Sequence, residues 1–471
     1  MPRRAAKAKV APSDSEYARA VGQLSERRRF GMRPGLETIR AVLDGLGDPQ
    51  RSFRSIHVTG SKGKGSVTAI AASILTATGA KVGRFTSPHL VSYRERIAVD
   101  GDPIDPAGVV AGLQRIEVLT KELLRRGAID REPTFFEVTT ALAFDWFREQ
   151  RVDAAVVEVG LGGRLDSTNV LDAPVGVIST VELEHTEVLG PTLTDIAREK
   201  AGILHAGMSA IVGETKAEPL AEIGRILDPL GVPVWRLGAQ LAVGPRSLDE
   251  EGQTFGVATP HRTYPSLRLP LHGSVQATNT VLAVAAVERF QEAVDRTLTE
   301  RHVQKGLDAV RWRGRLERFG TRPEGWLDVA HTPESARALA QSLAEISPLA
   351  DPAGNVVVFG CLAEKRVDEI LESLSPLATT VVVVRVRSAR ALAAEAMRRS
   401  AVGRFPRIVV APDVGTAWKL ARAAADPEGF VLVTGSDYLV GELIAHVEGR
   451  PADEPDLSDP GLGAAPGEAG P

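Results

Sequence analysis

A strand, a glycine-rich turn and a helix follow one another between residues 56 and 79, and this stretch constrains the fold most strongly. The β-branched run from Ile56 to Thr59 predicts a buried strand. Small and apolar residues predict a helix that ends near Gly79. Backbone N–H groups at the start of such a helix can bind the phosphates of a nucleotide. Three glycines lie in the turn: Gly60, Gly63 and Gly65.

The turn also carries side chains that suit a triphosphate. Lys64 is placed to reach the β- and γ-phosphates, and the Ser66 hydroxyl is placed to bind Mg²⁺. The spacing departs from the standard P-loop, because only Ser61 and Lys62 separate the first glycine from the Gly-Lys pair. An ordinary glycine-rich turn with exposed lysines is the alternative. The flanking strand and helix favour phosphate binding.

The composition excludes several classes of protein. A chain of 471 residues is long enough for two or three domains. A net charge of −4 does not indicate a nucleic-acid or membrane surface as the main partner. No apolar run approaches the roughly 18 residues of a membrane span. The single cysteine, Cys361, excludes an intrachain disulfide and predicts a reducing, cytoplasmic location, and we expect it to be a small buried residue rather than a catalytic thiol.

The two ends of the chain differ in composition from the rest. Residues 1–15 are basic but lack the apolar core of a signal peptide, so they predict a disordered tail. Residues 451–471 are rich in proline, glycine and acidic residues and predict a disordered acidic tail. Between them we expect two domains, at 16–308 and 309–450.

Strand and helix patterns alternate through both domains. The alternation predicts an α/β fold, with an N-terminal P-loop domain whose parallel sheet has helices on both faces, and a smaller C-terminal Rossmann-like α/β domain. Residues 236–273 have short polar strands, which we expect to form an antiparallel edge on the first domain. Strands are predicted at 56–59, 82–85, 154–159, 175–180, 208–212 and 232–235, and then at 326–329, 355–359, 380–386, 407–410 and 430–434.

Polar residues near the carboxyl ends of strands are candidate ligands. Glu158 ends an apolar strand, at the edge where open α/β sheets bind ligands. A buried carboxylate needs a cation, which is either Mg²⁺ beside the phosphates or the side chain of Arg164. His185 follows another strand and is either a metal ligand or a solvated loop residue.

Two further residues have an ordinary interpretation beside a functional one. Lys200 lies in a predicted helix, where a lysine is ordinarily exposed. His331 follows the strand that carries Asp328, at the carboxyl end of the second sheet. A capping role in the loop before the next helix is the alternative for this histidine.

Taken together, these stretches resemble the folylpolyglutamate synthase and dihydrofolate synthase family of the Mur ligase superfamily. The resemblance covers about residues 30–450, and it rests on the number and order of separate motifs. They are HVTGSKGKGSV at 57–67, FTSPHL at 85–90, FFEVTT at 135–140, VEVGLGGRLDSTN at 157–169, HTEVLG at 185–190, IAREKAGI at 196–203, RWRGRLE at 311–317, LDVAHTP at 327–333, VVVFGCLAEK at 356–365 and VLVTGSDYLVGE at 431–442.

The resemblance implies an ATP-dependent ligase that adds L-glutamate to a folate, to dihydropteroate or to both through an acyl phosphate. It also implies a monomer that uses ATP and two Mg²⁺ ions. A Mur-type ligase on another carboxylate substrate and a non-catalytic nucleotide-binding homologue are the alternatives. The motif at 85–90 marks the folate branch and argues against another Mur substrate.

Matching positions give each candidate residue an implied role. Lys64, Lys200 and His331 are the catalytic candidates, with Lys200 as a carbamylated lysine and His331 as a contact of the incoming glutamate. The folate is expected near residues 87–97 and 135–140. The implied nucleotide-binding residues are Gly60, Ser61, Lys62, Gly63, Lys64, Gly65, Ser66, Asn279, Arg315 and Asp328. The implied metal ligands are Ser66, Ser87, Glu158 and His185.

Several positions depart from the family pattern. The pair Ser61-Lys62 stands where Thr-Asn is usual, and Glu184 stands where Asp is usual. Val329 replaces a glycine, and Thr332 replaces an asparagine after the candidate histidine. The last change bears on which amino acid the enzyme couples.

Overall fold

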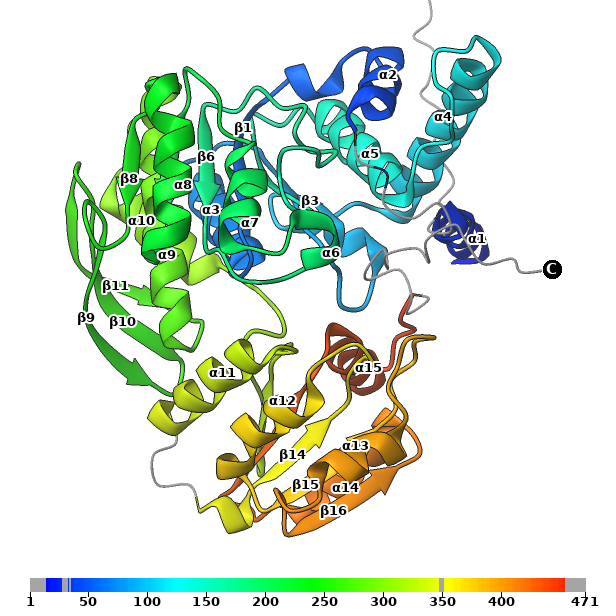
Figure 1. Ribbon diagram of the computed structural model, residues 1–471, viewed down its shortest axis with the longest axis vertical. Coiled ribbons are helices and arrows are strands. Elements are labelled where there is room, and N and C mark those ends of the chain that lie inside the picture. Colours follow the sequence, from blue (N-terminus) through cyan, green and yellow to red (C-terminus); the bar gives the residue numbers. More distant parts are fainter. Residues whose placement is uncertain (1–13, 28–32, 34, 347–350, 454–471) are drawn as a thin grey trace, which may run out of the picture.

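The computed structural model describes residues 14–27, 33, 35–346 and 351–453. Two α/β domains, each built on its own sheet, lie one above the other in Figure 1. The predicted fold class is confirmed. The predicted boundary between residues 308 and 309 falls at the end of helix α10 and remains a prediction.

The N-terminal domain is built on an eight-stranded sheet in the order β4-β3-β2-β5-β1-β6-β7-β8. Six neighbouring strands pair in parallel, in the order β2-β5-β1-β6-β7-β8. At one edge, β3 pairs antiparallel with β2 and with β4. The carboxyl ends of β1, β5 and β6 are therefore neighbours, at the edge where such sheets bind ligands. The strands are β1 (Arg54–Thr59), β2 (Val82–Phe85), β3 (Ile97–Val99), β4 (Asp102–Pro103), β5 (Ala154–Glu158), β6 (Val175–Ile178), β7 (Ser209–Val212) and β8 (Val234–Arg236).

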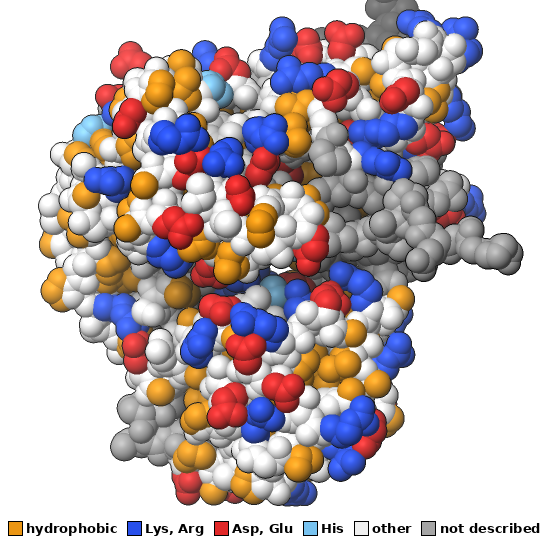
Figure 2. Space-filling model, viewed as in Figure 1, with side chains coloured by type: hydrophobic (Ala, Val, Ile, Leu, Met, Phe, Trp, Pro, Cys, Tyr) orange, Lys and Arg blue, Asp and Glu red, His pale blue; other side chains and the backbone are white. Residues whose placement is uncertain are grey.

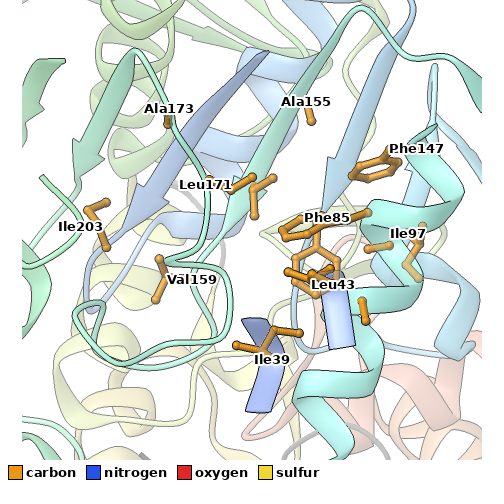
Figure 3. Packing of buried hydrophobic residues seen from close by; sticks show 14 of the residues in the cluster. Ile39, Leu43, Phe85, Ile97, Phe147, Ala155, Val159, Leu171, Ala173 and Ile203 are labelled. Carbon is orange, nitrogen blue, oxygen red and sulfur yellow. The ribbon is translucent and has the colours of Figure 1, made fainter. Parts of the chain in front are cut away.

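Helices cover both faces of this sheet, as predicted. On one face, α2, α4, α5 and α7 surround an apolar core, part of which is seen in Figure 3. On the other face, α3, α9 and α10 pack over a second core. The helices are α1 (Asp14–Glu26), α2 (Glu37–Gly45), α3 (Lys64–Ala77), α4 (Pro106–Arg125), α5 (Phe135–Gln150), α6 (Thr186–Leu189), α7 (Leu193–Ala201), α8 (Ala217–Leu227), α9 (Ser274–Ala293) and α10 (Glu300–Ala309), with 3₁₀ helices η2 (Pro49–Arg51), η3 (Tyr93–Arg96) and η4 (Asp228–Leu230).

The antiparallel strands expected at the edge of the main sheet instead form a sheet of their own. Strands β9 (Ala242–Asp249), β10 (Gly252–Ala258) and β11 (Thr263–Leu269) pair in the order β11-β10-β9. Their apolar residues join the core beneath α9, as Phe255 and Leu267 do. The strands do not extend the main sheet, because β9 and β11 both pair with β10 rather than with a strand of that sheet.

The C-terminal domain has a six-stranded sheet in the order β12-β13-β17-β14-β15-β16. All pairs are parallel except β12 with β13, and β12 was not predicted from the sequence. The strands are β12 (Glu317–Thr321), β13 (Glu324–Leu327), β14 (Val356–Phe359), β15 (Thr380–Val384), β16 (Arg407–Ala411) and β17 (Phe430–Thr434). The helices are α11 (Pro333–Ile346), α12 (Val367–Leu374), α13 (Ala394–Ala401), α14 (Val414–Ala424) and α15 (Asp437–Glu448), with 3₁₀ helices η5 (Pro352–Gly354) and η6 (Ser375–Leu377).

The predicted tails extend a little too far into the folded protein. Helix α1 begins at Asp14, so residues 14 and 15 are helical rather than part of a tail. At the other end, Asp453 is hydrogen-bonded to the N-terminal domain. The rest of both predicted tails lies outside the described residues.

The surface between the two domains is hollowed, and acidic and basic side chains line this hollow in Figure 2. Lys62 of the first domain and His331 of the second lie close enough across the domain boundary for the lysine charge to act on the histidine. No described helix is long and apolar enough to cross a membrane.

Candidate active site

The predicted phosphate loop is a tight turn between β1 and α3. Gly60 and Gly63 have φ angles of 145° and 85°, which side-chain-bearing residues rarely adopt. A Cβ atom on Gly63 would lie 2.5 Å from Oδ1 of Asn279, which comes from α9. Lys64 begins α3, and its Nζ donates a hydrogen bond to the Gly60 carbonyl over 2.9 Å. The loop backbone is therefore open to close approach by a ligand, with a cation beside it.

Residues that follow β6 hold the loop in place. The Ser61 N–H donates to the Thr180 carbonyl over 2.8 Å, and the Lys62 N–H donates to Thr180 Oγ1 over 2.9 Å. Burial lowers the pKa of Lys62, against the opposing charges of Glu184 and Glu182. No hydrogen bond joins the Lys62 ammonium to another described residue, so this ammonium is available to bind an anionic ligand.

Glu158 ends β5 beside this loop, and its side chain is buried. Its Oε2 atom accepts a hydrogen bond from the Ser87 N–H over 3.0 Å and lies 3.5 Å from where a Cβ atom on Gly65 would be. Burial raises the pKa of Glu158 to about 7, and the charge of Lys64 opposes this rise. Arg164 pairs instead with Glu199 over 2.7 Å, so the predicted alternative of a Glu158–Arg164 salt bridge was wrong.

The other predicted metal ligands differ in their surroundings. Ser66 follows Gly65, and neither its hydroxyl nor that of Ser87 is hydrogen-bonded to another described residue. His185 precedes α6, is exposed, and has a left-handed φ of 47°. Among the described residues, no three His, Cys, Asp or Glu side chains come together as a metal cluster. One carboxylate and two hydroxyls still suit Mg²⁺, which uses few protein ligands and takes the rest from phosphates and water.

Lys200 lies inside the site rather than on the surface of its helix. Its side chain is 1% exposed, and its Nζ lies 3.1 Å from Oε1 of Glu184. Burial lowers the pKa of Lys200 to about 8, although Glu184 opposes this shift. Burial by itself would raise the pKa of Glu184, but the positive charge of Lys200 above all lowers it to about 2. The interpretation of Lys200 as an exposed helix lysine was therefore wrong.

The C-terminal domain contributes Asp328 and Arg315. Asp328 accepts hydrogen bonds from the N–H groups of Leu316 and Ala330, both over 2.8 Å. Burial raises its pKa to about 6, and Arg315 opposes the rise. The same arginine also acts on the pKa of Glu158 in the other domain. Arg315 is thus close enough to affect carboxylates on both sides of the hollow.

His331 is held in one tautomer. Its Nδ1 donates to the Val329 carbonyl over 2.9 Å, which leaves Nε2 as an acceptor. Burial lowers the pKa of His331 to about 3, and the nearby charges of Lys62 and Lys365 contribute. The imidazole is therefore neutral at physiological pH. The alternative for His331 was a capping role at the start of α11. Thr332 has that role instead, because its hydroxyl accepts a hydrogen bond from the Ser335 N–H over 3.3 Å.

Two residues at the site were not singled out from the sequence. A Cβ atom on Gly65 would lie 2.7 Å from Cζ2 of Trp312, so this ring covers the start of α3. The guanidinium of Arg84 lies over the same ring, 5.3 Å from its centre. The tryptophan belongs to the motif at 311–317, and its size next to a run of arginines was the available signal.

A phosphate loop, a buried carboxylate and a second α/β domain across a hollow define an ATP-dependent ligase of the Mur type. Residues 58–287 match the Mur ligase middle domain, and residues 314–437 match the Mur ligase glutamate ligase domain. The chain belongs to the folylpolyglutamate synthase/dihydrofolate synthase family, and it is an ATP-dependent acid–amino-acid ligase.

The family assignment rests on relatives that match along most of their length. A dihydrofolate synthase/folylpolyglutamate synthase of Mycobacterium tuberculosis is 40% identical over 84% of this chain and 84% of its own. A folylpolyglutamate synthase of Lacticaseibacillus casei is 32% identical over 91% of this chain and 97% of its own. A crystal structure of Mycobacterium tuberculosis folylpolyglutamate synthase complexed with ADP and AMPPCP is 37% identical and covers 93% of this chain and 99% of its own, with a TM-score of 0.83.

Proposed function

We propose that this enzyme joins L-glutamate to the carboxylate of a folate, of dihydropteroate or of both, with ATP as the energy source. One observation carries the proposal. A glycine-rich loop lies beside a buried carboxylate, and its Lys62 is close enough to His331 of the second domain for the lysine charge to join burial in lowering the pKa of that histidine, in a chain similar to dihydrofolate and folylpolyglutamate synthases. The structure of Escherichia coli FolC in complex with DHPP and ADP, at 29% identity and a TM-score of 0.79, supports the choice of substrates.

The phosphate loop binds the triphosphate in this proposal. The N–H groups of residues 63–66, at the start of α3, and the Lys64 ammonium neutralise the β- and γ-phosphates. Asn279 packs against the loop and contacts the nucleotide from α9. Arg315 and Asp328 contact it from the C-terminal domain.

Glu158, Ser66 and Ser87 hold one Mg²⁺ ion, and His185 helps to hold a second. When bound, Mg²⁺ neutralises the charge that develops as the γ-phosphoryl group moves. The ligands of the first Mg²⁺ ion are hard oxygen atoms. The Ser87 N–H holds one oxygen of Glu158, and the other oxygen is available to the ion. A bound cation also keeps Glu158 ionised against the rise of its pKa to about 7.

Lys200 is carbamylated in the active enzyme. The reaction requires the neutral amine, and the pKa of Lys200, lowered to about 8 by burial, makes that form accessible near neutral pH. The carbamate replaces a cation by an anion, so Lys200 then repels Glu184 and attracts a divalent ion.

The two chemical steps use both domains. The acceptor carboxylate, bound near residues 87–97 and 135–140, attacks the γ-phosphorus of ATP, and ADP leaves. The neutral amine of L-glutamate attacks the acyl carbon, the bond from that carbon to the phosphate oxygen breaks, phosphate leaves with the proton of the amine, and an amide forms. His331 accepts a hydrogen bond from the glutamate amino group through Nε2. Closure of the hollow excludes water, which would otherwise hydrolyse the acyl phosphate.

We also propose that the enzyme is a cytoplasmic monomer that needs no nucleic-acid or membrane partner. The net charge of −4 and the single cysteine support the absence of a nucleic-acid partner and a reducing location, and the monomeric state is what the resemblance to the family implies.

The test is a product assay with purified protein, Mg-ATP, L-glutamate and either dihydropteroate or tetrahydrofolate in parallel reactions. The expected result is glutamate-dependent phosphate release together with a product heavier by one glutamyl unit, identified by mass spectrometry. Product with only one acceptor would assign the enzyme to one branch of the family. ATP binding without a glutamylated product from either acceptor would contradict the proposal, and product from a muramyl substrate instead would favour another Mur reaction.

A further inference from the structure

The segment from Ser87 to Tyr93 starts in the N-terminal domain but is anchored in the C-terminal domain. Val91 is 3% exposed within the core that contains Leu439 and Val440 of α15. The Leu90 carbonyl lies against α15, where a Cβ atom on Gly441 would approach it to 2.0 Å. The segment is therefore wedged into the other domain.

Two carboxylates fix the backbone of this segment. Glu95 accepts hydrogen bonds from the N–H groups of Leu90, Val91 and Ser92, over 2.9, 3.1 and 2.8 Å. Glu95 lies in η3, which begins at Tyr93, the last residue of this segment. The second carboxylate, that of Asp453, comes from beyond the end of α15.

Asp453 joins three parts of the chain that are far apart in sequence. Its Oδ2 atom accepts from the Tyr93 N–H over 2.6 Å, from the Ser92 hydroxyl over 3.1 Å and from the Tyr17 hydroxyl of α1 over 2.7 Å. Its own N–H donates to the Val91 carbonyl over 2.9 Å. The residue lies outside both matched Mur ligase regions, which span 58–287 and 314–437.

The other end of the same segment reaches the active site. The Ser87 N–H donates to Oε2 of Glu158, beside the phosphate loop. A shift of residues 91–93 would therefore be passed along a short, hydrogen-bonded stretch to Ser87. The phosphate loop itself is held by residue 180 and has no hydrogen bond to this segment.

We propose that Asp453 is a positioning residue, which holds residues 87–93 so that the acceptor and metal side of the active site is fixed to the C-terminal domain. This inference rests on the proposed function of residues 87–97. It assigns Asp453 an effect on the acceptor and on Mg²⁺, and none on the binding of ATP to its loop when Mg²⁺ is saturating.

Asp453→Ala removes all three side-chain hydrogen bonds, and Asp453→Asn keeps an acceptor but loses the charge. Because the hydrogen bonds to the Asp453 carboxylate are lost, we expect Asp453→Ala to raise the KM for the acceptor about tenfold. Asp453→Asn and Tyr17→Phe should each give an intermediate rise. Tyr17→Phe should add little in the Asp453→Ala background, because the shorter contact of the Tyr17 hydroxyl is then already lost and only its 3.3 Å contact with the Ser92 hydroxyl remains.

Chain shortening provides a matched pair of variants. A chain that ends at Asp453 should behave like the full chain, whereas one that ends at Arg450 should be affected at least as strongly as Asp453→Ala, because it also loses the hydrogen bond from the Asp453 N–H to the Val91 carbonyl. In Asp453→Ala, the KM for ATP and the thermal midpoint should stay close to wild type. Amide hydrogen exchange should rise in residues 90–96 and stay unchanged in β1.

The alternatives give distinct results. Equal losses for acceptor and ATP, together with a lower thermal midpoint, would show a merely structural residue and overturn the proposal. Faster exchange at residues 90–96 with an unchanged acceptor KM would also overturn it. If the wild-type enzyme glutamylates neither acceptor, the proposed function fails. The exchange of residues 90–96 and the Mg²⁺ dependence of AMPPCP binding then test the effect of Asp453 by themselves.

Discussion

Lys200 donates a hydrogen bond to Oε1 of Glu184 over 3.1 Å, although its side chain is almost completely buried. A buried lysine with a lowered pKa reacts more readily with CO₂, because the neutral amine is the nucleophile. The same pair also explains why the ammonium form is tolerated, since Glu184 balances its charge.

The carbamate on Lys200 is the first prediction. Its formation should increase as pH rises through about 8, since the lowered pKa makes the neutral amine more abundant there. With ¹³C-bicarbonate, NMR should show a carbamate carbon in the wild type and not in Lys200→Ala, and a short carboxylate should partly restore that variant's activity. Lys216→Ala is the matched control, because Lys216 also lies near a glutamate but is half exposed. A wild-type enzyme that is active without this carbon signal would contradict the carbamate.

Glu158→Gln should abolish activity and yet stabilise the fold at alkaline pH. The raised pKa means that the folded protein holds a proton which the unfolded chain releases between about pH 4.5 and 7. Wild-type stability from this group is thus present below pH 4.5 and is lost as pH rises to about 7. Without Mg²⁺ and nucleotide, the variant should be more stable by about 2–3 kcal/mol at pH 8 and equal near pH 4.5. Urea unfolding measures this, with Glu187→Gln as an exposed control, and a variant less stable at pH 8 would refute the assignment.

Lys64→Ala should lower kcat by at least about 100-fold, because a preorganised cation at the transferring phosphoryl group is lost. Glutamate-dependent phosphate release measures the effect. Lys121→Ala serves as the control, since Lys121 is exposed and its ion pair is with Glu117, away from the phosphate loop in sequence. Normal turnover in Lys64→Ala would mean that the phosphate loop is misassigned.

Gly63→Ala should weaken nucleotide binding much more than Gly79→Ala. Both glycines have a positive φ, at 85° and 89°, so each alanine pays a similar backbone cost of about 1–2 kcal/mol. A Cβ atom at Gly63 would also meet Asn279 Oδ1 at 2.5 Å, whereas that at Gly79 would meet nothing within 4 Å. Titration with AMPPCP separates the two variants, and equal affinities would argue against a role for the Gly63–Asn279 contact.

His331→Ala should raise the KM for L-glutamate about tenfold and leave the KM for ATP nearly unchanged, since one hydrogen bond to a charged amine is lost. Because the pKa of His331 is lowered to about 3, its titration should not contribute to the pH profile above pH 5. Steady-state kinetics at several pH values test both points. An equal rise of both KM values would place the histidine at the nucleotide instead.

The sequence was sufficient for features that depend on neighbouring residues. Alternating apolar runs predicted the parallel strands of both sheets, such as β15, Thr380–Val384, within the predicted range 380–386. The glycines at 60, 63 and 65 marked the phosphate loop, because only a backbone without side chains can bend and open in this way. The order of the motifs also identified the family.

Only the tertiary structure decided which distant groups meet. The sequence did not indicate that Arg164 pairs with Glu199 instead of Glu158, or that Lys200 is buried beside Glu184. It also assigned Asp453 to a tail, although that residue binds Tyr93 across the domain boundary. Local periodicity fixes which face of an element is apolar, but the pairing of charges depends on how the elements pack. Burial then sets the pKa of each group, so the chemistry of the site appears only once the chain is folded.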